Sequence, residues 1–82
     1  MVTAAQIRAA RAILGWNGAR LAEAAGVSLQ TIRRMESDLG PGRSSAANVN
    51  AVQRALEDAG VLFLGPNELQ EGGPGVRLKP GK

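Results

Sequence analysis

Apolar residues recur every three or four positions in four stretches of the first 59 residues, which is the spacing of one face of a helix. The first stretch predicts a helix from about Ala4 to Leu14. Its inward residues are Ile7, Ala10 and Leu14. Thr3 and Gln6 have the spacing of a capping box, and Gly15 is a typical helix stop. The pattern therefore predicts a first helix with defined ends.

Two shorter helices follow, joined by a tight turn. Asn17 is the cap of the first, expected over residues 18–25, and Ser28 is the cap of the second, expected over residues 29–37. Gly26 between them suits a left-handed backbone conformation. The inward residues are Leu21, Ala22, Ala25, Ile32 and Met35. Because Ala22 has no bulk, the two helices can cross closely, which is typical of a helix-turn-helix.

A fourth helix, capped by Ser44 or Ser45, is expected to reach Ala59. Its inward residues are Val49, Val52 and Leu56. After Gly60 the pattern changes: residues 61–64 form a short apolar run and residues 76–79 alternate apolar and charged, as strands do. We therefore expect a mainly α fold, with a four-helix core in residues 1–60, a long-looped β-hairpin in 61–79 and a frayed tail at 80–82.

Composition excludes much of the chemistry that enzymes use. The 82 residues include no Cys, His or Tyr, so thiolate, imidazole and phenol groups are absent, and we expect neither a metal nor a cofactor. The adjacent Glu57 and Asp58 point apart on a helix, and the glycine-rich segment 72–75 lacks the Lys and Ser/Thr of a phosphate-binding loop. We therefore expect no enzyme. Because no membrane span or secretory signal is visible, a soluble cytoplasmic protein is expected.

The net charge of +3 comes entirely from the first half of the chain. Residues 1–43 contain six arginines against three acidic residues, whereas residues 44–82 contain four of each sign. The planar guanidinium of arginine matches phosphate groups and guanine edges better than the ammonium of lysine does. The charge distribution therefore fits a nucleic-acid partner, and it fits an ordinary solvated surface about equally well.

Several short motifs agree in order and spacing with one known family. These motifs are Leu14-Gly15-Trp16, Leu21-Ala22-Glu23, Ala25-Gly26-Val27-Ser28 and Thr31-Ile32-Arg33-Arg34-Met35-Glu36. Through them the chain resembles the lambda-repressor-like, XRE-type helix-turn-helix family over roughly residues 3–60, as a small single-domain member. The resemblance implies a four-helix DNA-binding core and a transcriptional regulator that usually works as a dimer.

One position departs from that family. Its members often have glutamine at the first residue of the second helix, where it touches the DNA backbone or a base, and this chain has Gly18. The contact is therefore lost here or passes to Asn17 or Arg20. The departure bears on the preferred DNA site more than on DNA binding itself.

With Ile32 and Met35 inward, the other face of the third helix points outward. Gln30 can pair with adenine and Arg34 with guanine, each through two hydrogen bonds. The base-reading candidates are Ser28, Leu29, Gln30, Arg33 and Arg34. Leu29 has two interpretations, contact with a thymine methyl group or the edge of the core. The phosphate candidates are Asn17, Arg20, Thr31 and Arg43.

Four other residues near these helices have structural interpretations. Arg8 and Arg11 are expected on a solvated helix surface, and Trp16 is expected in the core. Glu36 is expected to form an ion pair or a hydrogen bond within the fold, because a carboxylate repels DNA phosphate.

The hairpin predicts a homodimer. A two-stranded hairpin alone is marginal in water, and its free edges can pair with another chain. A second copy would bury these edges and set two recognition helices about one DNA turn, ~34 Å, apart. The residues predicted at this contact are Val61, Leu62, Phe63, Leu64, Val76 and Leu78. The alternative is a hairpin that only covers the core of its own chain.

Together these observations predict a sequence-specific regulator that binds double-stranded DNA. Residues 28–37 are expected to enter the major groove of a palindromic operator. Two alternatives remain at this point. One is a protein-interaction module on the same fold, favoured by Gly18 and the modest charge, and the other is an antitoxin-type autoregulator with a protein partner.

Overall fold

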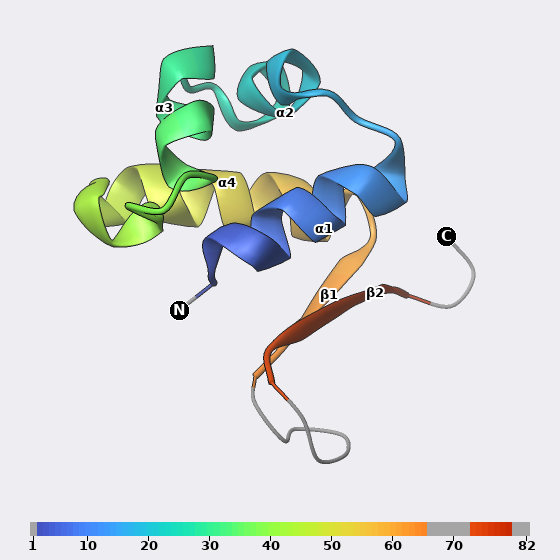
Figure 1. Ribbon diagram of the computed structural model, residues 1–82. Coiled ribbons are helices and arrows are strands. Elements are labelled where there is room, and N and C mark those ends of the chain that lie inside the picture. The colour runs from blue at the N-terminus through green and yellow to red at the C-terminus, as the bar shows by residue number, and fades with distance from the viewer. Residues whose placement is uncertain (1, 66–72, 80–82) are drawn as a thin grey trace.

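The structure, a computed structural model, describes residues 2–65 and 73–79, with the side chain of Arg43 left out. Its elements are α1 (Ala4–Leu14), α2 (Gly18–Ala25), α3 (Leu29–Met35), the short 3₁₀ helix η1 (Pro41–Arg43), α4 (Ala46–Asp58), β1 (Val61–Leu64) and β2 (Gly75–Leu78). The four α-helices pack together, and the hairpin lies beside α1 (Figure 1). The mainly α core with a C-terminal hairpin is thus confirmed. Within the described ranges, no helix has the length and apolar character needed to cross a bilayer.

The predicted side-chain caps are present at the start of all four α-helices. Thr3 Oγ1 accepts a hydrogen bond from the Gln6 amide at 3.1 Å, and Gln6 Oε1 accepts one from the Thr3 amide at 2.8 Å, which completes the capping box. Asn17, Ser28 and Ser45 each accept from the amide three residues later. These caps satisfy amides that the helices leave free, so local sequence determines where each helix begins.

The helix ends agree less closely with the prediction. Gly15 and Gly26 end α1 and α2 with φ +72°, the left-handed conformation expected. α3 ends at Met35, two residues early. The Ser37 hydroxyl donates to the Arg34 carbonyl at 2.6 Å and accepts from the amide of Leu39, so it closes a turn that competes with further helix. β2 is also displaced, starting and ending one residue before the predicted strand.

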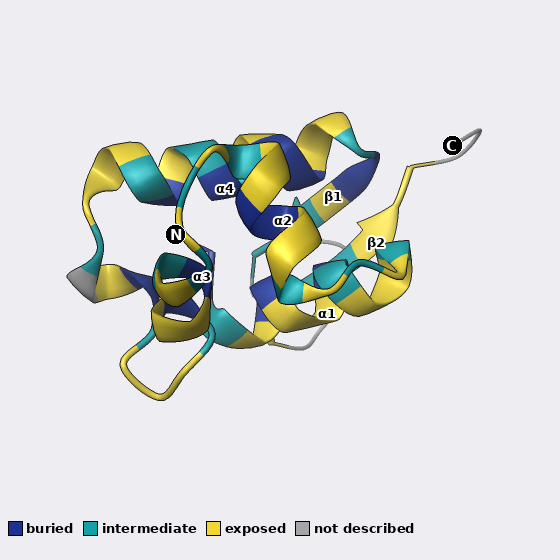
Figure 2. Cartoon of the chain, turned by 90° about the horizontal axis from the view of Figure 1, so that it is seen from above, coloured by how far each residue is buried: buried dark blue, intermediate teal, exposed yellow. Residues whose placement is uncertain are grey.

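The core is aliphatic and lies where the helices face one another (Figure 2). Each of the four α-helices and the first strand contributes a fully buried side chain. The largest of these are Ile7, Leu21, Ile32, Met35, Val52, Leu56 and Val61. Buried alanines in α1, α2 and α4 let the helices approach closely. The predicted inward faces are confirmed, with Leu14 and Ala25 half-buried at the edge of the core.

The two strands pair antiparallel within the chain, with Val61 opposite Leu78 and Leu64 opposite Gly75. Gln6 of α1 is hydrogen-bonded to the end of this hairpin where Leu64 pairs with Gly75. Its Nε2 donates to the Leu64 carbonyl at 3.0 Å and to the Gly75 carbonyl at 2.9 Å, and the residue is only 6% exposed. The hairpin is therefore both packed on the helices and hydrogen-bonded to them. Most of the predicted connection between the strands, and the tail at 80–82, lie outside the described residues.

The six residues predicted at a dimer contact differ in how far they are buried within their own chain. Val61 is 0% exposed in the core of its own chain, so the prediction that it faces a second copy is wrong. Phe63 and Val76 are half-buried against the same core. Leu62 and Leu78 are 37% and 39% exposed, and Leu64 is intermediate. The hairpin covers its own core with one face and leaves other apolar side chains accessible.

Candidate nucleic-acid interface

The outward face of α3 is polar and accessible. Ile32 and Met35 are fully buried, which sets the rotation of the helix about its axis. At roughly 100° per residue, Gln30 and Arg34 lie opposite this buried stripe, one turn apart, and Arg33 lies beside them. All three are exposed. The outward orientation predicted for these side chains is thus confirmed.

The two arginines at the end of α3 are available to bind an anion. Among the described residues, neither Arg33 nor Arg34 forms an ion pair. Both lie in the last turn of the helix, where the partial negative charge of the helix end stabilises a cation. The face therefore combines one amide and two guanidinium groups, which are the groups that form paired hydrogen bonds to adenine and guanine edges.

The start of α3 uses its hydroxyl groups within the fold. Ser28 Oγ accepts from the Thr31 amide at 3.0 Å and lies 2.8 Å from Thr31 Oγ1, to which it is hydrogen-bonded. Ser28 is exposed and Thr31 is half-buried. The structure thus gives Ser28 a capping role, and its predicted contact with a base stays a prediction, as does the contact of Thr31 with phosphate.

Leu29 lies on the flank of α3 that faces the start of α2. It is half-buried and packs against the core. Its Cδ1 lies only 3.0 Å from the position that a β-carbon would take on Gly18. Of the two interpretations of Leu29, this packing favours the edge of the core.

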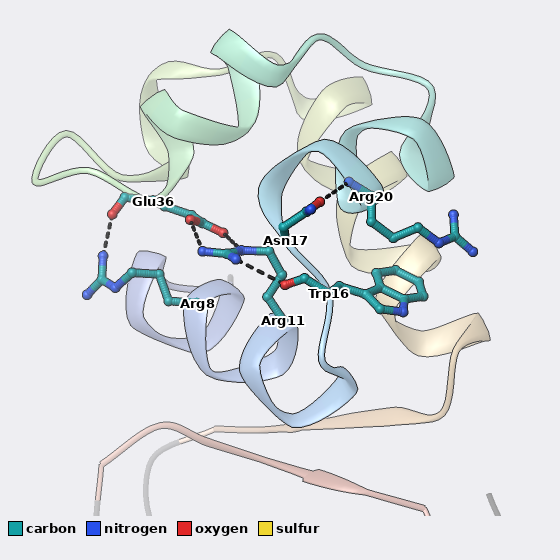
Figure 3. A network of polar contacts seen from close by, with 6 residues as sticks. All are labelled: Arg8, Arg11, Trp16, Asn17, Arg20 and Glu36. Carbon is teal, nitrogen blue, oxygen red and sulfur yellow. Dashed lines mark hydrogen bonds and ion pairs between the residues drawn. The ribbon is translucent and has the colours of Figure 1, made fainter.

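The predicted phosphate contacts of α2 lie around its first turn. Asn17 Oδ1 accepts from the Arg20 amide at 2.8 Å and so caps the helix (Figure 3). The Arg20 guanidinium lies 4.6 Å from the ring centroid of Trp16 and 3.3 Å from a carboxylate oxygen of Glu23. Such exposed contacts contribute about 0.5–1 kcal/mol at most, so phosphate could displace them. Trp16 is half-buried: it packs on the core and also supports Arg20.

Arg11 is not on a solvated surface, and that prediction is wrong. Its Nε lies 2.7 Å and its Nη2 2.9 Å from the two carboxylate oxygens of Glu36, while Nη1 donates to the Trp16 carbonyl at 3.1 Å. The two side chains are 25% and 12% exposed. The pKa of Arg11 is raised above its ordinary value, mainly by the hydrogen bond to Glu36, with the nearby negative charge adding to it and burial opposing it. The structural role predicted for Glu36 is confirmed.

Arg8 adds a second link to the same residue. It is exposed, as predicted, and its Nη1 donates to the backbone carbonyl of Glu36 (Figure 3). Glu36 is the C-terminal cap of α3, so Arg8 and Arg11 hold the end of α3 against α1. The sequence did not predict the contact between Arg11 and Glu36, because local helix geometry cannot show that residues 25 positions apart meet. This network orients the outward face of α3.

Two further observations complete the interface. The side chain of Arg43, the fourth predicted phosphate contact, lies outside the described residues, and its backbone belongs to η1, between α3 and α4. Among the residues that the structure describes, no group of three or more Asp, Glu, His or Cys side chains is placed to hold a metal ion.

The sequence was also compared with known proteins. A family model described as helix-turn-helix (HTH_3) matches residues 7–57, which extend from the first turn of α1 almost to the end of α4. No curated protein and no solved structure matches the chain. The matched region includes all of α2 and α3 and most of α1 and α4, and it ends before the hairpin.

Proposed function

Because the chain belongs to the XRE-type helix-turn-helix family, we propose that it is a sequence-specific regulator of transcription that inserts α3 into the major groove of a palindromic operator. Helix-turn-helix domains of this family bind DNA and are typically not catalytic. The proposal adds a regulatory role and a particular set of contacts to that family membership. A regulator of this kind works on the chromosome, so the proposal also implies a cytoplasmic location.

The outward face of α3 is the observation that supports the proposal most directly. Gln30 and Arg34 share the centre of this face, and Arg33 lies on its flank. A glutamine amide matches the major-groove edge of adenine, and a guanidinium matches that of guanine, with about 1–3 kcal/mol of discrimination for each good pair. We assign base recognition to these three residues.

The proposed phosphate contacts surround that face. Asn17 and Arg20 lie at the start of α2, Thr31 lies in the first turn of α3, and Arg43 precedes α4. Contacts of this kind position a protein on the duplex and make binding sensitive to salt. The positive charge of residues 1–43 supports this assignment.

Selection from a random duplex library, followed by affinity measurement, tests the proposal. We expect a twofold-symmetric consensus. Replacing both Arg33 and Arg34 with alanine should lower affinity for it by at least about tenfold, since each lost base pairing removes roughly 1–3 kcal/mol. The far-ultraviolet circular dichroism spectrum should stay unchanged. Arg54→Ala removes one positive charge, against two in the double variant, from an exposed site on α4 and serves as the control for a loss of charge away from α3.

Three results would contradict this function. Failure to select any duplex sequence would favour the protein-interaction module, and so would binding that does not weaken as salt increases. Affinity in the double variant equal to that of the Arg54→Ala control would show that α3 does not contact the bases. Capture of an unrelated protein by the hairpin, together with DNA binding, would identify the antitoxin-type arrangement.

We also infer that the protein binds its operator as a homodimer through the hairpin. The exposed leucines Leu62 and Leu78 and the unpaired outer edges of the two described strands support this inference. Removing the whole hairpin would open the core, because Val61 is buried there. Leu62→Glu is therefore the better test. Sedimentation should show a dimer for the full chain and a monomer for this variant, and a full chain that is monomeric at tens of micromolar would refute the dimer.

A further inference from the structure

We infer that Gly18 and Leu29 form a steric pair that sets how closely the recognition helix approaches the start of α2. An ideal β-carbon built on Gly18 would lie 3.0 Å from Leu29 Cδ1 and 4.0 Å from Ile32 Cγ2. A contact of 3.0 Å is tighter than nine in ten of those that real β-carbons make, so a side chain at position 18 would force the tip of Leu29 to move by a few tenths of an ångström. The inference rests on the proposed function, since it concerns the placement of α3 on DNA.

Backbone conformation does not account for this glycine. Gly15 and Gly26 have positive φ, whereas Gly18 is the first residue of α2 and has no such value. In a helix, alanine is intrinsically more stable than glycine, so helix propensity alone would favour Ala at this position. The close approach of Leu29 is the opposing effect. Gly18 is therefore explained by packing.

The pair lies beside the groups assigned to base recognition. A groove of about 350 Å³ opens there between the start of α2 and the flank of α3. The residues that line it include Gly18, Leu29, Arg33 and Glu36. Leu29 is the first residue of α3 and precedes Gln30, so a backbone shift that relieves the contact at Leu29 would move the start of the helix and its flank together. Gly18 and Leu29 thus act as positioning residues, with no contact of their own to a base.

Thermal unfolding of four variants tests the steric pair without DNA. Gly18→Ala in the natural chain should lower Tm by about 3–8 °C, because overpacking outweighs the gain in helix propensity. In a Leu29→Ala chain the same change should leave Tm unchanged or raise it, because the obstructing atom is gone. Gly42→Ala is the matched control, since a β-carbon there would meet nothing within 4 Å. Leu29→Val, which also lacks Cδ atoms, replaces Leu29→Ala if that chain folds poorly.

Equal Tm shifts for Gly18→Ala in both backgrounds would overturn the pair, because the effect would then not depend on Leu29. A rise in Tm for Gly18→Ala in the natural chain would also overturn it. These outcomes need no operator, so they separate failure of the pair from failure of the proposed function.

Affinity for the selected duplex tests the positioning role. Gly18→Ala should weaken binding by about five- to tenfold without changing the preferred base at any position, and adding Leu29→Ala should restore affinity to within about threefold. Loss of a thymine preference in the Leu29→Ala variant would show that Leu29 contacts a base, which would overturn its assignment as a positioning residue. Unchanged affinity in Gly18→Ala would overturn that role for the pair.

Discussion

Replacement of Gln6 with leucine should remove the hydrogen bonds that join the hairpin to α1, while approximately conserving the size of the side chain. Gln6 is nearly buried and accepts one backbone hydrogen bond, from Thr3, and donates two, to Leu64 and Gly75. Leucine forms none of them. The main-chain cap at this helix is retained, because the Thr3 hydroxyl binds the backbone amide of residue 6. The variant therefore removes the hydrogen bonds between the helix and the hairpin, together with the side-chain half of the capping box.

The expected loss follows from the three hydrogen bonds, which measure 2.8, 3.0 and 2.9 Å. A buried group left without its partner costs about 1–3 kcal/mol, and leucine regains part of this by burying apolar surface. We expect the free energy of unfolding to fall by about 2–4 kcal/mol, which is a large share of the ~5–15 kcal/mol typical of a domain. In a chain of this size, Tm should fall by at least about 8 °C.

Urea and thermal unfolding followed by far-ultraviolet circular dichroism measure this loss. Gln53→Leu is the matched control, because Gln53 donates only one 3.3 Å hydrogen bond, to Glu57 four residues later on the surface of α4. That change should alter the free energy of unfolding by less than about 0.5 kcal/mol. If Gln6→Leu is no more destabilising than the control, the hairpin is held by apolar packing alone and the argument from hydrogen bonding fails.

Four further predictions concern the helices that present the interface. Glu36→Gln should lower the free energy of unfolding by about 1–3 kcal/mol in urea, because it removes the charge that pairs with Arg11 in a mostly buried site, whereas Glu57→Gln on the exposed face of α4 should have little effect. Because folding raises the pKa of Arg11, its ion pair contributes fully to the free energy of unfolding below the ordinary pKa of arginine, and this contribution is lost only in strongly alkaline solution. The destabilisation caused by Glu36→Gln should therefore stay constant between about pH 6 and pH 9. Gly26→Ala should cost about 1–2 kcal/mol by thermal unfolding, since φ is +72° and no atom lies within 4 Å of the added carbon to compensate; a neutral result would contradict the left-handed turn. Arg20→Gln should change stability by less than about 1 kcal/mol but reduce the salt dependence of operator binding by about one phosphate contact, and an unchanged slope would remove Arg20 from the interface.

Local sequence was sufficient to place the four helices and the outward face of α3. Hydroxyl and amide caps, glycine stops and the helical spacing of apolar residues act over three or four positions, so one segment shows them without its neighbours. The buried faces of α3 and α4 followed from the same spacing, and so did the exposure of Gln30 and Arg34. Family membership rests on this same region, since the family model matches residues 7–57.

Contacts between distant segments could not be predicted in this way. Arg11 meets Glu36 across 25 positions, and Gln6 meets Leu64 and Gly75 across 58 and 69 positions. Such pairs depend on how the helices and the hairpin pack, because a single helix face does not reveal which segment will cover it. For the same reason, the sequence predicted Arg11 on the solvated surface, whereas packing places it in a partly buried ion pair with Glu36. Packing also places Leu29 against Gly18. The helical pattern alone could not decide whether this leucine belongs to the edge of the core or contacts DNA.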